Sequence, residues 1–179
     1  QFKDWYGYSA PRNLVLHDRA QILIPLLANR GVFALVPDEF RGKLCPMASG
    51  GFTIALDAPG VVRPEYVLGL LNSTLLFWKL ELESNIFRGG WITCTKQYFG
   101  ELPIRTINFD DPSEKAMHDK VVGLVEKMID AKKNLSAART DRDREFYERY
   151  CENLDRQIDD LVYQLYDITD EERKIIEGN

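Results

Sequence analysis

Two loops of this sequence, each with a Gly-Gly pair, carry most of the side chains that could bind a charged ligand. Candidate contacts in the loop of residues 38–51 are Arg41, Lys43 and Ser49. Candidate contacts in the loop of residues 85–97 are Arg88, Trp91, Thr95, Lys96 and Gln97. Arginine and lysine bind phosphates, arginine and glutamine pair with the edges of guanine and adenine, and tryptophan stacks on bases. These residue types favour a nucleic-acid ligand.

The side-chain chemistry sets an expected role for each candidate. Arg88 and Gln97 suit bases because each can form two parallel hydrogen bonds with one base, and Lys43 and Lys96 suit phosphates. Trp91 could stack on a base or wedge between bases, although a loop tryptophan commonly pins its own loop to the protein. Glycine pairs allow a ligand backbone to approach closely, but they are also ordinary turn residues.

The aromatic N-terminal segment offers one further contact. Residues 5–12 read W-Y-G-Y-S-A-P-R, so Arg12 and the tyrosine hydroxyls could reach phosphates. Aromatic residues at this density usually pack on a sheet, and both interpretations stay open.

No catalytic constellation is recognisable. Adenine-N6 methyl transfer needs an Asn/Asp-Pro-Pro-aromatic loop and a glycine-rich turn between a strand and a helix. None of the eight prolines adjoins another, and there is no G-x-G-x-x-G. Asp38 and Asp130 lie too far apart in the sequence for a nuclease metal site, and His17 and His118 have no nucleophile at a recognisable spacing. We expect no catalytic residue and no metal ligand in this chain, and we interpret both histidines as surface or core residues.

The net charge of −5 does not exclude nucleic acid as a partner. Residues 1–105 hold 11 lysines and arginines against 9 acidic residues, a balance of +2, whereas residues 106–179 hold 12 against 19, a balance of −7. Because DNA affinity follows the local basic surface, the acidity of the C-terminal third matters little for a loop elsewhere. A balance of +2 is nevertheless small for a nonspecific DNA-binding protein.

The composition is that of an ordinary globular protein, with 45% hydrophobic and 28% charged residues among 179. No window of 18 apolar residues and no secretory signal is present, so we expect neither a membrane span nor secretion. Cys45, Cys94 and Cys151 are widely separated, which is typical of reduced thiols in the cytoplasm. Because the first residue is Gln1, we expect the chain to be a piece of a longer polypeptide.

Short strands and a helix pair must hold the two loops. Apolar runs predict strands over residues 20–25, 31–37 and 52–56. Pro64 opens a helix with one apolar face, and Asn72 or Ser73 caps a second helix that ends before the second loop. Alternation over residues 93–97 predicts one more short strand.

The C-terminal third predicts an antiparallel helical hairpin. Asp111, Pro112 and Glu114 are typical of a helix start, and a charged turn at residues 140–144 precedes a second amphipathic helix. A capping box at residues 169–172 opens a short last helix. The predicted fold class is α+β: a small mixed β-sheet with two packed helices forms residues 1–108, and a long antiparallel helical hairpin with a short terminal helix forms residues 109–179.

The order of four short motifs resembles the TaqI-like specificity domain of adenine-N6 DNA methyltransferases and of fused (type IIG) restriction–modification enzymes. The motifs are Leu71-Asn72-Ser73, Gly89-Gly90, Thr95-Lys96-Gln97-Tyr98 and Leu102-Pro103-Ile104. The resemblance covers roughly residues 5–105, and residues 158–176 also look like the end of these enzymes. Gln21 departs from the pattern, which has a lysine there, so no phosphate contact is carried over to that position.

The resemblance implies a target-recognition domain that reads a short sequence of double-stranded DNA, in the major groove, for a bacterial, cytoplasmic restriction–modification enzyme. The parent enzyme would be an adenine-specific methyltransferase, with or without endonuclease activity. Its N-terminal methyltransferase domain, absent from this chain, would bind S-adenosylmethionine, and this chain itself would bind no cofactor. The implied DNA contacts are Arg12, Arg41, Lys43, Ser49, Arg88, Trp91, Thr95, Lys96 and Gln97. They would share one concave surface if the two loops lie side by side.

A protein-interaction module is the competing interpretation, in which the helical hairpin docks a partner and the two loops are inert. A self-contained hydrolase is disfavoured because the nucleophile and the metal ligands are missing.

Overall fold

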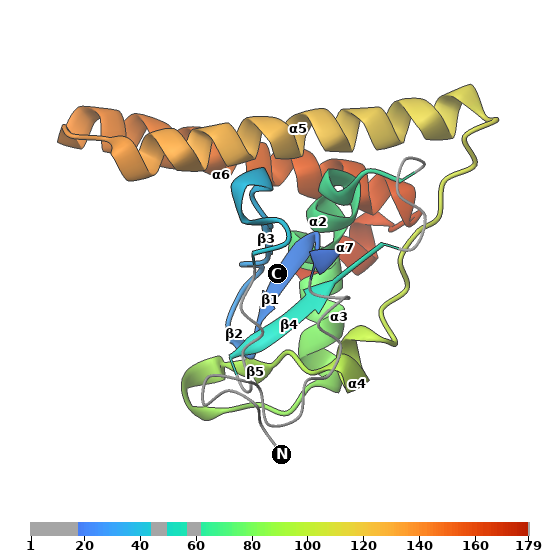
Figure 1. The fold of residues 1–179 in the computed structure, drawn as a ribbon. Helices are drawn as coiled ribbons and strands as arrows, with labels where there is room; N and C mark the ends of the chain where they lie inside the picture. Colours follow the sequence, from blue (N-terminus) through green and yellow to red (C-terminus); the bar gives the residue numbers. More distant parts are fainter. Residues whose placement is uncertain (1–17, 44–49, 57–61, 179) are drawn as a thin grey trace, which may run out of the picture.

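The structure, a computed structural model, describes residues 18–43, 50–56 and 62–178, and its class is α+β, as predicted. The described elements are β1 (Ile22–Pro25), β2 (Leu27–Ala28), β3 (Ala34–Leu35), the 3-10 turn η1 (Asp38–Phe40), β4 (Gly51–Ile54), α2 (Pro64–Asn72), α3 (Thr74–Glu83), the 3-10 turn η2 (Arg88–Gly90), β5 (Ile92–Thr93), α4 (Lys96–Phe99), α5 (Pro112–Ala137), α6 (Asp141–Leu165) and α7 (Asp170–Ile176). Figure 1 shows α5 and α6 across one end of the molecule, with the strands and α2–α3 below them. The predictions for Arg12, His17, Cys45 and Ser49 lie outside the described residues.

The strands form two small sheets. β1 lies at the centre of one, between β3 and β4, and β2 pairs with β5 in the other. Every one of these pairings is antiparallel, where the sequence predicts one small mixed sheet. The predicted strand over residues 93–97 is wrong beyond Thr93, because β2 offers partners only to Ile92 and Thr93, and Lys96 then begins α4.

Helices α2 and α3 meet at Asn72 and Ser73. Pro64 is the first residue of α2, as predicted. Ser73 caps α3, since its hydroxyl accepts a hydrogen bond from the Leu76 N–H. The Asn72 side chain instead accepts from the Phe33 N–H at 2.9 Å and donates to the Phe33 carbonyl at 3.0 Å. This amide therefore fastens the helix pair to the residue that precedes β3.

Helices α5 and α7 begin where the sequence predicts, whereas α6 begins at Asp141, inside the predicted turn of residues 140–144. Asp111 and Thr140 cap α5 and α6 through hydrogen bonds to backbone N–H groups of the first turn. The capping box of α7 is complete, because the Thr169 hydroxyl accepts from the Glu172 N–H while the Glu172 carboxylate accepts from the Thr169 N–H. Within the described ranges, no helix has both the length and the apolar character needed to cross a membrane.

One hydrophobic core joins the larger sheet, the helix pair and the C-terminal helices. Its fully buried members include Ile22, Leu70, Val121 and Val162. α2 approaches α5 closely at Gly69, where an added Cβ would lie 2.9 Å from a methyl carbon of Val121 and another of Val125. The boundary between residues 108 and 109 stays a prediction, and it falls in the segment that runs along the outside of the molecule from α4 to α5 (Figure 1).

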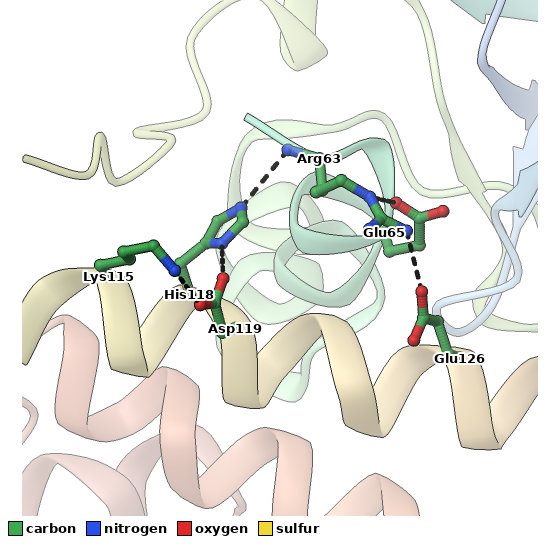
Figure 2. Close-up of polar contacts among 6 residues, drawn as sticks. All are labelled: Arg63, Glu65, Lys115, His118, Asp119 and Glu126. Atoms are coloured by element: carbon green, nitrogen blue, oxygen red, sulfur yellow. Dashed lines mark hydrogen bonds and ion pairs between the residues drawn. The ribbon is translucent and has the colours of Figure 1, made fainter. Parts of the chain in front are cut away.

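A polar joint also holds the start of α2 on α5, as Figure 2 shows. The Arg63 guanidinium bonds Glu65 at 2.9 Å and Glu126 at 2.8 Å. The buried His118 accepts the Arg63 N–H at Nε2, 3.3 Å away, and its Nδ1 lies 2.9 Å from the Asp119 carboxylate. Nδ1 therefore carries the imidazole proton. Of the two interpretations of His118, the structure supports a core residue with a structural role.

Candidate functional site

Residues 85–93 form a β-hairpin, hereafter the tip hairpin. A hydrogen bond from the Phe87 N–H to the Trp91 carbonyl, 2.5 Å long, closes it near the turn, and one from the Thr93 N–H to the Asn85 carbonyl, 3.2 Å long, closes it at the base. Both helix α3 before it and strand β5 within it belong to the protein body. The chain therefore leaves the body, turns and returns within a few residues.

The turn itself requires two glycines. Arg88, Gly89 and Gly90 form η2, and the φ angles of Gly89 and Gly90 are 76° and 79°. Residues with a Cβ rarely adopt this left-handed conformation, whereas glycine does so without steric cost. Backbone geometry alone thus explains the second Gly-Gly pair, without any ligand.

The base of the tip hairpin is firmly held. β5 pairs with β2, and the Cys94 N–H donates to the Leu26 carbonyl at 2.8 Å. Ile92 and Cys94 are 1% and 0% exposed. Burial raises the pKa of the Cys94 thiol to about 11, so this cysteine is a packing residue and not a reactive thiolate.

Three large apolar side chains of the tip hairpin face solvent. Ile86 is 75% exposed, Phe87 59% and Trp91 41%. A Cβ added at Gly89 would lie 3.8 Å from Cδ1 of Trp91, so the indole lies against the turn. Exposed apolar groups gathered on one loop mark an interaction surface. Ile86 and Phe87 were not among the candidates predicted from the sequence, although two apolar residues directly before Arg88-Gly89-Gly90 were a signal for exposed apolar side chains at the turn.

The polar candidates continue from the tip hairpin into α4. Lys96 and Gln97 are exposed, while Thr95 is half-buried at the N-cap position and its side chain makes no capping hydrogen bond. Residues 84–100 contain Arg88 and Lys96 and no acidic residue. The stretch itself therefore has a balance of +2, and Glu83 and Glu101 flank it directly.

Leu26 connects the first Gly-Gly pair with the base of the tip hairpin. The Leu26 N–H donates to the Gly50 carbonyl at 3.4 Å, and the Leu26 carbonyl accepts the Cys94 N–H. The glycine end of the first loop therefore adjoins the base of the tip hairpin, as expected from the sequence.

Arg41 and Lys43 do not join this surface. Figure 1 places residues 38–43 beneath α5 and α6, at the opposite end of the molecule from the tip hairpin. The antiparallel register explains the separation, because β3 ends beside Ile22 at one end of β1, whereas Gly51 pairs with Pro25 at the other end. The expectation that both loops share one concave surface is therefore wrong for Arg41 and Lys43, which lie apart from the tip hairpin and α4 (Figure 1).

Arg41 instead forms a local ion pair. Its Nε lies 3.1 Å from Oδ1 of Asp38, and both side chains are largely exposed. A pair of this kind contributes little to stability. The Asp38 carboxylate also offsets the positive charge of Arg41, which was expected to bind a ligand.

No model of a known protein family matches this chain, and no solved structure matches it. Among curated proteins, the chain is similar to the type II restriction enzyme and methyltransferase RM.Eco57I of Escherichia coli, with 27% identity over 175 residues. The alignment covers 96% of this chain but 17% of that protein, so the activities in its name belong to a much longer polypeptide. The similarity supports a domain related to restriction–modification.

Proposed function

We propose that this chain is the DNA target-recognition domain of a restriction–modification enzyme and that the tip hairpin, with α4, reads the duplex. The observation that carries the proposal is the tip hairpin. Hydrogen bonds hold its base to the protein body, its large apolar residues are exposed, and it contains a cation but no acidic residue. Two-stranded β-ribbons are known to read DNA from its grooves. The similarity to a restriction enzyme and methyltransferase supports the same function.

The proposed contacts have separate roles. Arg88 and Gln97 pair with bases, Lys96 binds a phosphate, and Thr95 hydrogen-bonds the DNA beside it. Trp91, whose indole lies against Gly89, supports the turn. Arg12 and Ser49 stay proposed contacts on sequence grounds alone.

The finer proposal follows the TaqI-like resemblance. The parent enzyme methylates adenine at N6 in the bacterial cytoplasm, and a methyltransferase domain outside this chain binds S-adenosylmethionine. The present chain holds double-stranded DNA against that domain, which flips the adenine out of the duplex. Whether the parent enzyme also cleaves DNA is a separate property of the longer polypeptide.

Selection from randomised DNA tests the proposal. The immobilised protein is offered a pool of duplexes with a random core, and the bound duplexes are amplified and sequenced. We expect one short motif to be enriched, with binding that weakens as salt rises because the protein releases counterions from phosphates. A pool that stays random after repeated selection would overturn the proposed function.

A matched pair of double variants tests which surface of the protein binds DNA. Replacing both Arg88 and Lys96 by alanine should abolish enrichment, whereas replacing both Arg41 and Lys43 by alanine should leave it intact. Each variant removes two cations, so the net charge changes equally in both. Equal loss in the two variants would show a general charge effect and would exclude the tip hairpin as the reading element.

A protein-interaction module is the second candidate function, favoured by aromatic residues on α6. Phe146 and Tyr150 stack with ring centroids 6.3 Å apart, and they are 61% and 38% exposed. The beginning of α6 lies at the end of the helical hairpin that extends beyond the rest of the molecule (Figure 1). If this end docks a partner protein, Phe146→Asp should abolish that association in sedimentation experiments and leave DNA selection unchanged. Unchanged association would exclude this function for the hairpin end.

A further inference from the structure

We propose that the tip hairpin distorts its DNA by inserting the Phe87 ring between two neighbouring base pairs. This inference rests on the proposed function, and it adds a mechanism: recognition by unstacking as well as by hydrogen bonding. The ring would separate one base step while the flanking cation holds the backbone. Sequence steps that unstack readily would then bind best, even at positions that no polar side chain reads.

The apolar residues at the turn of the tip hairpin are exposed to solvent. Phe87 is 59% exposed and its neighbour Ile86 is 75% exposed, next to a turn where the chain projects from the protein. Trp91, in contrast, lies against Gly89 and is the least exposed of the three. Phe87 is thus the more exposed of the two aromatic side chains of the tip hairpin, while the Trp91 indole lies against the turn.

The backbone of the tip hairpin, which contains Phe87, is held by hydrogen bonds on both sides of the turn. A side chain can separate stacked bases only if its own backbone does not yield, because unstacking costs free energy. The Phe87 N–H is bonded to the Trp91 carbonyl directly across the turn. Below that bond, β5 is paired with β2, and Ile92 is buried in the core. The backbone that carries Phe87 is therefore anchored to the hydrophobic core of the protein.

The charged residues near Phe87 favour DNA over a protein as the ligand of the tip hairpin. Arg88 follows Phe87 directly, Lys96 lies a short way beyond, and residues 84–100 contain no acidic residue. Proteins that bend DNA insert phenylalanine or isoleucine at a base step and place cationic side chains on the neighbouring phosphates. In the sequence, Phe87 is followed by two cationic residues, which is the composition that such an arrangement requires.

Base unstacking can be measured directly in solution. The chain of 179 residues is mixed with a duplex from the selection, in which 2-aminopurine replaces each adenine of the enriched motif in turn. The fluorescence of 2-aminopurine rises when the base loses its stacking partner, and we expect this rise at one position. Phe87→Ala should remove the rise and weaken binding about tenfold, within the usual effect of losing one aromatic–base stack.

Three further variants control the measurement. Phe87→Leu keeps an apolar wedge and should retain most of the fluorescence rise, whereas Phe87→Ser should lose it. Phe40→Ala removes a phenylalanine of similar exposure, 51%, from the opposite end of the molecule, and it should change neither quantity. Because Phe87 is mostly exposed, thermal unfolding should be the same for its variants as for the unmodified protein.

The possible outcomes distinguish failure of the proposed Phe87 insertion from failure of the proposed DNA recognition. Specific binding without a rise at any position would overturn the wedge and leave DNA recognition standing. Failure of the protein to bind any duplex would overturn both. If Phe87→Ala leaves binding and fluorescence unchanged but alters self-association in sedimentation, the exposed residues form a protein interface and the wedge is overturned.

Discussion

Arg88 is the residue on which sequence specificity is expected to depend, because it lies in the turn of the tip hairpin and guanidinium groups pair with guanine through two hydrogen bonds. Arg88→Ala should therefore cost about 1–3 kcal/mol of binding free energy and relax specificity at one base position. Competition binding with duplexes altered at each position of the selected motif measures both effects.

Arg41→Ala is the matched control for this prediction. Arg41 already pairs with Asp38 and lies at the far end of the sheet, so its loss should change binding by less than about 0.5 kcal/mol. If Arg88→Ala instead weakens binding to all duplexes equally, Arg88 contacts a phosphate and specificity comes from another residue.

Asp159 should make stability depend on pH in an identifiable direction. Burial raises the pKa of this carboxyl group, while hydrogen bonds from the Thr74 N–H and hydroxyl hold it lower. Because the net shift is upward, protonation favours the folded state. The contribution of Asp159 to the free energy of unfolding is thus complete below its ordinary pKa of 3.8 and is lost as pH rises through the raised value.

The Asp159→Asn variant isolates that contribution, because an amide can still accept from the Thr74 N–H but does not ionise. We expect the stability of the variant relative to the unmodified protein to increase as pH rises from below 3.8 through the raised pKa. Urea unfolding at several pH values gives the difference. A difference that stays constant across this range would contradict the prediction.

At the scale of elements, Asn72 joins the α2–α3 pair to the sheet. Asn72→Ala should lower the free energy of unfolding by about 1–3 kcal/mol, because the partly buried Phe33 N–H and carbonyl both lose their partner. Asn134→Ala, on the exposed surface of α5, is the control and should change stability by less than about 0.5 kcal/mol. Urea unfolding compares the two, and equal effects would show that the Phe33 bonds contribute nothing beyond helix propensity.

Elements with local signals could be predicted from the sequence, and those that depend on a distant partner could not. Pro64, Asp111 and the capping box of α7 mark helix starts through interactions within one turn, and all three are confirmed. Strand β2 has two residues and pairs only with Ile92 and Thr93, so the end of β5 is set by the length of β2. Neither the existence of β2 nor the end of β5 can be predicted from the residues of that strand alone. Asn72 looks like a helix cap, but its partner Phe33 lies 39 residues away.

The same distinction applies to the candidate site. A Gly-Gly pair after a cation predicts a tight turn, and the exposure of Lys96 and Gln97 follows from their polarity. The position of Arg41 depends instead on the register of β3 against β1, which composition does not specify. The turn and the exposed polar residues of the second loop could therefore be predicted from the sequence, whereas the position of Arg41 and Lys43 relative to that loop could not.

At the scale of the molecule, charge is separated along the fold. Residues 106–179, with a balance of −7, form mainly the helices at one end, whereas the tip hairpin and α4 lie at the other end without an acidic residue (Figure 1). A polyanion would therefore be repelled more strongly from the first end than from the second. This separation would orient the protein before contact and would leave the helical end for other parts of a longer polypeptide.

The shared core also predicts how the whole molecule unfolds. Gly69→Ala places a Cβ against Val121 and Val125, and overpacking of this kind outweighs the helix propensity gained, for a net loss of about 1–2 kcal/mol. Gly123→Ala is the matched control, because its Cβ would meet no atom within 4 Å and alanine favours the helix by up to about 1 kcal/mol. The two variants should shift stability in opposite directions.

Both variants should nevertheless shift one common transition. The core that Gly69 helps to pack includes residues of β1, α2, α5 and α6, so no part of it can unfold alone without exposing the rest. Thermal unfolding followed by helical circular dichroism and by tryptophan fluorescence should give the same midpoint for each variant. If Gly123→Ala moved only the helical signal, residues 109–179 would be an independently folding domain, and the close contact at Gly69 would be a docking contact between two domains.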